Sequence, residues 1–438
     1  MRKILKFVKK ILKIFYLLFP KIIRNQYSES LQYYQQIIRD LFIREKNKLI
    51  IFKDVHLIQI PVSCSKLKII SKVENRATSI AAVSLYLNNN SYKVLPEVRG
   101  HIPDLYLLEC NNVQCIGWSL GILLNDKTYY HPELYNQLYI YDNKVPSIHQ
   151  FTNCANEIED LQLAVTNNYR KFDNVIHLLK EHSTNYYHWL FEIMPRLIKV
   201  VDHLANNVEY QNQLFTILVN KGVVRNCIEL LALAMPSKFC YEVEYIEKGE
   251  LVKCKKLHYV SPFWYAFDNT KHYPDVSKDF LVDRSAVQMV REALCYHKEV
   301  VDSNARKIYL GRRNGQMRNI INVEQVESMM ENLGFEMIFT DIMSIEDQIN
   351  LFQSAKIVVG AAGAAFSNMI FMQQDANVVM FSPSIKRTNY YIFQQIADVS
   401  GVNLVHFLTT PKKGAKTVHD DFYIDCDDLQ ILLNKLDV

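Results

Sequence analysis

Hydrophobic and polar positions follow two different patterns along this 438-residue chain. Between about Lys48 and Gln150, short apolar runs are separated by Asn, Pro, Gly and charged residues, which predicts short strands with irregular connections. From about Asp173 onward, apolar runs alternate with longer segments whose apolar residues recur every three or four positions. Because strands that alternate with helices pair in parallel, this second pattern predicts an α/β fold.

The alternating part of the chain divides into two series at the polar segment Asp302–Arg306. The first series contains a predicted buried strand at Val175–Leu179 and a helix at Tyr186–His203 with a kink at Pro195. The second series is predicted to contain these elements: strands Lys307–Leu310, Phe335–Phe339, Lys356–Val359, Asn377–Phe381 and Asn403–Phe407, with helices Val323–Asn332, Ile345–Ser354, Ala364–Phe371, Tyr390–Val399 and Asp427–Leu436. We expect two α/β lobes, with a ligand site at the carboxyl ends of their strands.

Composition and charge exclude several classes of protein. Hydrophobic residues make up 49% of the chain and charged residues 22%, which excludes a wholly disordered chain and a polytopic membrane protein. The net charge of +4 is too small for a general nucleic-acid binder, so no nucleic-acid partner is expected. The nine cysteines include no C-x-x-C pair, which disfavours a disulfide framework or a zinc site and favours a reducing compartment.

The first 20 residues have the pattern of a basic amphipathic helix that ends at Pro20. One face carries the apolar residues Ile4, Phe7, Val8, Ile11, Ile14, Phe15 and Leu18, and the other carries Lys3, Lys6, Lys10 and Lys13. The apolar runs are too short to span a bilayer, and lysines interrupt any signal-peptide core. The segment is predicted to lie on an anionic membrane surface; packing against the body of the protein is the alternative.

The segment Asn185–Arg196 places two titratable residues on one helical face. His188 and Glu192 are four residues apart, so their side chains meet on a helix and could form an acid–base pair. Arg196 continues the same face if the kink at Pro195 allows. The alternative is a surface ladder of His, Glu and Arg beside the buried residues Trp189 and Leu190.

Two loops after strands of the second series have features suited to a diphosphate. Arg312, Arg313 and Arg318 follow the strand Lys307–Leu310, and guanidinium groups bind phosphate oxygens in pairs. Small residues including Gly360 and Gly363 follow the strand Lys356–Val359 and precede a helix, where free N–H groups face a ligand. Each loop alone is also compatible with an ordinary solvated turn. Asp425 and Asp427 precede the last helix and are interpreted as capping residues, so no metal site is expected.

Taken together, these segments resemble glycosyltransferase family 61, a family that includes bacterial capsular-polysaccharide transferases and eukaryotic N-acetylglucosaminyl- and xylosyltransferases. The resemblance extends from about Asp173 to Phe381, and the tail His419–Asp425 is similar as well. It rests on the following motifs: Asn185-Tyr-Tyr-His-Trp-Leu-Phe-Glu-Ile-Met-Pro-Arg196, Gly311-Arg-Arg with Arg318, Asn322-Val-Glu324, Ser344-Ile-Glu-Asp-Gln348 and Gly363-Ala-Ala-Phe-Ser-Asn368.

The resemblance implies a GT-B architecture, in which two Rossmann-like lobes face each other across a cleft, and an inverting transfer that requires no metal. A nucleotide-sugar donor, with a UDP-sugar favoured, would bind the C-terminal lobe, and an oligosaccharide or polysaccharide acceptor the N-terminal one. The donor-binding candidates are Arg312, Arg313, Arg318, Gly363, Ala364, Ser367 and Asn368, and the acceptor or orientation candidates are Asn185, Tyr187 and Arg196. We favour Glu192 as the base with His188 orienting it, although the reverse assignment fits the spacing almost as well.

The sequence therefore predicts four segments: a membrane-surface helix at 1–25, an N-terminal lobe at 26–302 that becomes Rossmann-like from about 173, a donor-binding lobe at 303–410 and a tail at 411–438. Synthesis of a capsular or other cell-surface polysaccharide on the cytoplasmic face of a bacterial membrane is the expected role. Two alternatives remain: a non-catalytic assembly scaffold, and a transferase of a non-sugar group. The family often has a histidine before the loop glycine, where this chain has Ala362, so a donor contact is either missing or supplied elsewhere.

Removing residues 1–20 should abolish sedimentation with anionic liposomes and leave a folded enzyme that is active on soluble acceptors. The lysine contribution is screened over about 8 Å at physiological ionic strength, so binding of the full chain should also weaken as salt is added. Liposome sedimentation over a salt series measures both effects. A full-length chain that ignores anionic liposomes, or a truncated chain that sediments equally well, would contradict the prediction.

Overall fold

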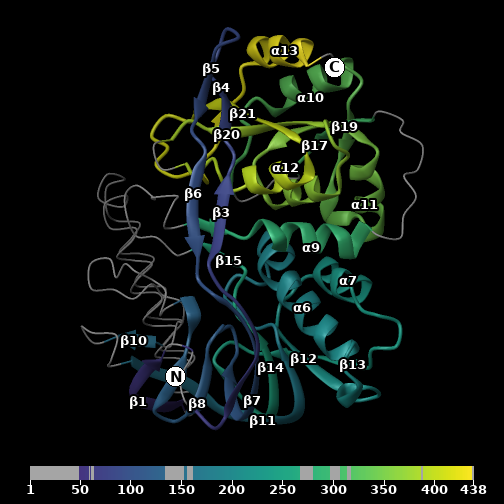
Figure 1. The fold of residues 1–438 in the computed structure, drawn as a ribbon. Coiled ribbons are helices and arrows are strands. Elements are labelled where there is room, and N and C mark those ends of the chain that lie inside the picture. The colour runs from purple at the N-terminus through teal and green to yellow at the C-terminus, as the bar shows by residue number, and fades with distance from the viewer. Residues whose placement is uncertain are drawn as a thin grey trace, which may run out of the picture.

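A computed structural model describes residues 49–58, 60, 64–133, 152–154, 161–266, 280–295, 306–312, 317–385 and 388–436. The predicted N-terminal helix lies outside these residues, as does Arg313. The described part is a mixed α/β structure with two large sheets, one below the other in Figure 1. None of its helices is long and apolar enough to cross a membrane.

The N-terminal sheet contains ten of the described strands and has the order β1-β9-β8-β7-β14-β11-β12-β13, with β2 beside β7 and β10 beside β11. Its strands are β1 (Leu49–Ile58), β2 (Leu67–Val73), β7 (Leu105–Ile116), β8 (Ile122–Asn125), β9 (Thr128–Tyr130), β10 (Thr152–Cys154), β11 (Leu161–His177), β12 (Phe215–Asn220), β13 (Tyr241–Ile246) and β14 (Glu250–Val260). Only β14, β11, β12 and β13 form the parallel arrangement that the sequence predicts. The strands β7 and β8 pair antiparallel.

Short and long helices follow the parallel strands of this sheet. They are α5 (Tyr186–His188), the π-helix η2 (Trp189–Ile193), α6 (Met194–Ala205), the 3₁₀-helix η3 (Val208–Tyr210) and α7 (Arg225–Leu233). Helix α9 (Arg284–Cys295) lies between the two sheets, as Figure 1 shows, and the short pair β15 (Trp264–Ala266) and β16 (Phe280–Val282) precedes it. The buried hydrophobic side chains of α6, α7 and α9 belong to one hydrophobic core that also includes residues of the other sheet.

The C-terminal sheet has the order β18-β17-β19-β20-β21-β4-β5 and is parallel from β18 to β4. Its strands are β17 (Arg306–Leu310), β18 (Glu336–Ile338), β19 (Ala355–Ala361), β20 (Asn377–Pro383), β21 (Asn403–Pro411), β4 (Val83–Tyr86) and β5 (Tyr92–Leu95), with β22 (Phe422–Tyr423) beside β21. The helices are α10 (Val323–Asn332), the 3₁₀-helix η4 (Thr340–Ile342), α11 (Ile345–Gln353), the 3₁₀-helix η5 (Ala364–Phe371), α12 (Gln394–Ser400) and α13 (Cys426–Lys435). The alternating elements predicted for this series are therefore present.

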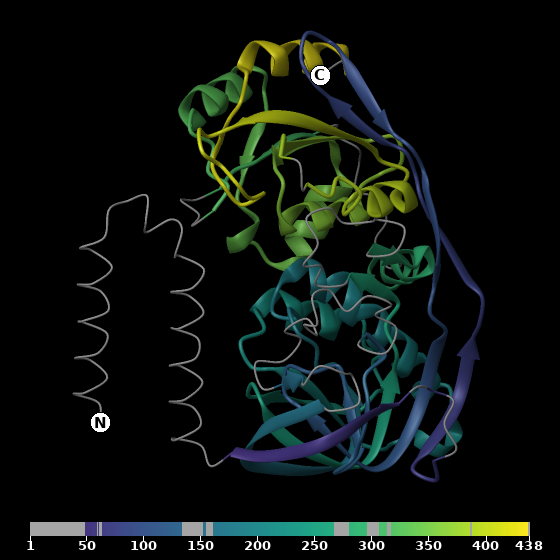
Figure 2. The same cartoon turned by 90° about the vertical axis from the view of Figure 1, so that its left-hand side faces the viewer.

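The two sheets share chain segments in a way that the sequence did not predict. The sequence pattern predicts that all of residues 26–302 lie on the N-terminal side, yet β4 pairs with β21 in the C-terminal sheet. A ribbon of β3 (Arg76–Ile80) and β6 (Val98–Ile102) connects this excursion to the N-terminal sheet and runs along one side of the molecule (Figure 2). Tyr86 stacks on Phe407, so hydrophobic contact across the sheet holds β4 in place.

Candidate active site

The His188–Glu192 segment forms a widened helix at the carboxyl end of β11. The side chain of Asn185 accepts a hydrogen bond from the Tyr187 N–H and so starts helix α5. The predicted kink at Pro195 is replaced by the π-helix η2, in which the Met194 N–H donates to the carbonyl of Trp189, five residues back. Single π-helical turns of this kind are frequent at functional sites.

Glu192 is a buried carboxylate with two nitrogen partners. Its side chain is 3% exposed, with Oε1 2.6 Å from Nδ1 of His188 and Oε2 3.4 Å from Nζ of Lys180. Lys180 also pairs with Glu133, which is buried as well. Burial alone would raise the pKa of Glu192, but the charges and hydrogen bonds of His188 and Lys180 outweigh it and lower this pKa to about 2. Glu192 is therefore an anion at any physiological pH.

The partner on Nδ1 determines which nitrogen of His188 carries the proton. An ionised carboxylate only accepts hydrogen bonds, so Nδ1 of His188 donates to Glu192. In the neutral ring, Nε2 then carries a lone pair and can accept a proton. The His188 side chain is 29% exposed, against 3% for Glu192, so the imidazole is the member of the pair that an acceptor hydroxyl can reach.

The other predicted residues of this segment have structural contacts. Arg196 is 1% exposed; its Nε donates to the carbonyl of Val260 at 2.9 Å and its Nη2 to His177, so it is not placed to contact an acceptor as the sequence suggested. Tyr187 is buried and donates through its hydroxyl to the carbonyl of Ile392. Asn185 is the helix cap described above.

The two candidate phosphate loops meet at one edge of the C-terminal sheet, as the sequence predicts. Strands β17 and β19 are adjacent and parallel. The chain continues from β17 to β18 on one side of this pair and from β19 to β20 on the other, so the two loops lie at the topological switch point of the sheet. Arg318 spans the gap, because its Nη1 donates to the carbonyl of Ala362 at 2.8 Å. The side chain of Arg312 is exposed, and its Nη1 lies 3.4 Å from the carbonyl of Arg318.

The small-residue loop, which joins β19 to η5 and contains Gly363, is only partly accessible to a ligand. Space for a side chain remains above Gly363, where an added Cβ would approach nothing closer than 3.7 Å. Ser367 and Asn368 are both fully buried, which differs from their predicted contact with a donor. Asn368 instead accepts a hydrogen bond from the Tyr186 hydroxyl at 2.6 Å and donates to Gln348 at 2.7 Å. It thus ties the start of the His188 helix to η5, the helix that follows the loop after β19.

A pocket with a volume of about 400 Å³ lies beside this contact and draws its walls from both halves of the molecule. Tyr186 and the start of α7, from Val224 to Asn226, line one side. Thr340–Ser344, Gln348, Ala364 and Ala365 line the other, which places Ala364 at a surface open to a ligand. The Asp341 carboxylate and the exposed Arg225 guanidinium supply polar groups within it.

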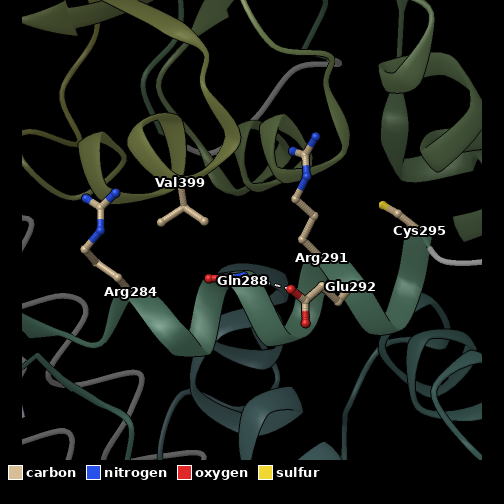
Figure 3. A pocket seen from close by; sticks show the side chains of 6 residues that line it. All are labelled: Arg284, Gln288, Arg291, Glu292, Cys295 and Val399. Atoms are coloured by element: carbon tan, nitrogen blue, oxygen red, sulfur yellow. Dashed lines mark hydrogen bonds between the residues drawn. The ribbon is translucent and has the colours of Figure 1, made fainter.

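A second pocket, of about 540 Å³, lies between α9 and α12 (Figure 3). Its arginines already have protein partners: Arg284 pairs with Asp398, and Arg291 donates to the carbonyls of Ile370 and Met372. These bonds hold α9 against the C-terminal half, and we assign the pocket no part in catalysis.

Residues 186–379 match the family model described as Glycosyltransferase 61. The match covers 194 of the 438 residues and supports assigning this region to glycosyltransferase family 61. The matched region begins at the helix that carries His188 and ends in β20, so it includes both phosphate loops. No curated protein matches the chain.

The family implies a sugar donor and a glycan acceptor. The geometry adds residues that the sequence did not reveal. Lys180 and Glu133 complete the charge pairing of Glu192, and Gln348 orients Asn368. Lys180 directly follows the predicted buried strand Val175–Leu179, so the sequence could have indicated it as a site residue. No feature of the sequence marked Glu133. His419 contacts Arg318 and had only its place in the similar tail. No group of metal-binding side chains occurs within the described ranges.

The stability conferred by Glu192 should depend on pH. A carboxyl whose pKa is lower in the folded chain stabilises the fold above its ordinary value of 4.5, and this contribution disappears as the pH falls toward 2. The urea midpoint of the wild type should therefore exceed that of Glu192→Gln most at about pH 7 and least at about pH 3. Glu331→Gln, on the exposed part of α10, is the control. A gap between wild type and Glu192→Gln that does not change with pH would refute the assignment.

Proposed function

We propose that this family 61 glycosyltransferase is an inverting, metal-independent enzyme that moves a sugar from a nucleotide-sugar donor, with a UDP-sugar favoured, to the hydroxyl of a glycan acceptor. The observation that carries the proposal is the 2.6 Å hydrogen bond between His188 Nδ1 and the buried carboxylate of Glu192. Tyr186, two residues before His188, donates to Asn368, which lies in η5, the helix that follows the small-residue loop.

In this proposal His188 is the catalytic base, which reverses the assignment favoured from sequence. Both oxygens of Glu192 face protein nitrogens, and its low pKa makes it a weak base. Nε2 of His188 takes the proton of the acceptor hydroxyl as its oxygen attacks the anomeric carbon and the bond to the leaving diphosphate breaks. The Glu192 carboxylate keeps the ring in the required tautomer and stabilises the imidazolium that forms.

The leaving diphosphate gains negative charge in the transition state, and we assign its stabilisation to the switch point of the C-terminal sheet. Arg312 and Arg318 supply guanidinium groups there, and Gly363 leaves the backbone open to a close approach. With two fixed cations, the site needs no metal in this mechanism. Arg313 is assigned to the same group by its place in the sequence.

We further propose a GT-B arrangement, with the acceptor on the N-terminal sheet and the donor on the C-terminal sheet. The pocket between Tyr186 and Thr340–Ser344 supports this arrangement, because both halves contribute to its walls. Residues 1–25 would hold the enzyme on the cytoplasmic face of a membrane, where it would extend a capsular or other cell-surface polysaccharide.

Incubating the full chain with a panel of nucleotide sugars and cell-surface glycan fragments tests the function. Mass spectrometry should detect a sugar added from one donor class, with turnover retained in EDTA because the arginines stabilise the diphosphate. NMR of the product should show an anomeric configuration opposite to that of the donor. Transfer of a non-sugar group, retention of configuration, or turnover that EDTA abolishes would each contradict the corresponding part of the proposal.

The assignment of the base predicts a specific effect on turnover. His188→Ala should lower kcat by about 10²- to 10⁴-fold, the usual contribution of a general base, with little change in donor KM. Glu192→Gln should also lower kcat, because the ring loses the charge that stabilises its protonated form.

His56→Ala, an exposed change on β1, serves as the matched control and should retain full turnover. Initial rates over a donor series measure kcat and KM, and circular dichroism checks that each variant is folded. Near-native turnover of folded His188→Ala would refute the role of the histidine. A severe loss in Glu192→Gln alone would restore the glutamate as the base.

A further inference from the structure

The tail of the chain places a histidine at the switch point of the C-terminal sheet. The backbone N–H of Arg318 donates to the carbonyl of His419 at 2.9 Å, although the two residues are far apart in sequence. Adjacent bonds extend this contact: Asn319 donates to the Asp421 carboxylate, and Ile321 N–H donates to the carbonyl of Phe422. These bonds therefore fix the segment that carries His419 to the loop of Arg312 and Arg318.

The guanidinium of Arg318 lies between His419 and the small-residue loop. Its Nη2 is 2.9 Å from Nδ1 of His419, and its Nη1 is 2.8 Å from the carbonyl of Ala362. One rigid, planar side chain thus positions the imidazole beside the loop that leads to η5. Arg312 adds a second cation next to the Arg318 carbonyl.

The arginine also fixes the protonation of the ring. A guanidinium has donors only and stays protonated, so Nδ1 of His419 must accept and carries no hydrogen. The proton of the neutral ring is then on Nε2, which has no hydrogen-bond partner among the described residues. Burial and the positive charge of Arg318 lower the pKa of His419, with Asp420 as the opposing charge, so the ring stays neutral.

We propose that Nε2–H of His419 donates a hydrogen bond to the diphosphate of the donor and so forms a third anion contact beside Arg312 and Arg318. This inference rests on the proposed function, since it specifies how the same site holds its donor. A neutral N–H group gives the hydrogen bond a direction and does not add a third positive charge beside the guanidinium groups of Arg312 and Arg318. It also gives the tail, which lies outside the region matched to the family, a part in binding.

Two isosteric substitutions separate this role from a structural one. In His419→Asn, the amide oxygen can take the place of Nδ1 and accept from Arg318, but no donor remains at the position of Nε2. In His419→Gln, the amide nitrogen can reach the position of Nε2, but the acceptor for Arg318 is lost. A residue that only holds Arg318 in place would tolerate Asn better than Gln, whereas a residue that binds the diphosphate would tolerate Gln better than Asn.

Binding of UDP, GDP, inorganic diphosphate and uridine to the full chain, measured by calorimetry, tests the proposal. His419→Asn should weaken the affinity for the nucleoside diphosphate and for inorganic diphosphate by about 10-fold or more, as expected for a hydrogen bond to a charged group. His419→Gln should stay within about 3-fold of the wild type, and uridine affinity should not change in either variant. His101→Asn, an exposed change on β6, is the matched control.

The outcomes are distinguishable. Wild-type affinity in His419→Asn, or a greater loss in His419→Gln than in His419→Asn, would overturn the inference and leave the proposed function intact. A wild-type chain that binds neither nucleoside diphosphate would overturn both. In turnover assays, the Asn variant should lower kcat/KM for the donor without changing the KM of the acceptor, and thermal unfolding should confirm that each variant is folded.

Discussion

The burial of the Glu192 carboxylate is the constraint on which the proposed catalytic site depends. An ionised carboxylate removed from water is costly unless opposite charges and hydrogen bonds compensate it. Lys180 and His188 provide that compensation, and Glu133 balances the ammonium of Lys180 in turn. Three separate stretches of chain must therefore come together before the anion is stable. Among these four side chains the imidazole is the most exposed, at 29%, against 9% or less for the others.

Two histidines of the structure carry their protons on opposite ring nitrogens, and their partners decide which. The carboxylate of Glu192 takes the hydrogen of His188 Nδ1 and leaves Nε2 free to accept. The guanidinium of Arg318 donates to His419 Nδ1 and leaves the hydrogen on Nε2. In the proposed mechanism, the same side chain can thus remove a proton from the acceptor and offer one to phosphate oxygens of the sugar donor. Neither role follows from the presence of a histidine; each follows from the charge of its neighbour.

The spacing of residues along the chain predicted contacts within one helix and between the loops of neighbouring strands. The interval of four residues brought His188 and Glu192 together, and the order of strands brought the loops of Arg318 and Gly363 to one edge of a sheet. Polarity alone was less informative, because a polar residue does not reveal whether its partner is a ligand or the protein. Asn368 and Arg196 looked like ligand contacts and are buried protein contacts. Glu133 and His419 could not be predicted from spacing, because their partners lie far away along the chain.

The placement of β4 in the C-terminal sheet has a consequence for how the chain folds during synthesis. Ser84 pairs with Val405, so this edge of the sheet joins residues about 320 positions apart. The hairpin of β4 and β5 is made early, but it cannot join the sheet until β21 has left the ribosome. The apolar side chains of β4, among them Val83 and Leu85, are then exposed throughout most of translation. We expect the two halves to complete folding together rather than one after the other.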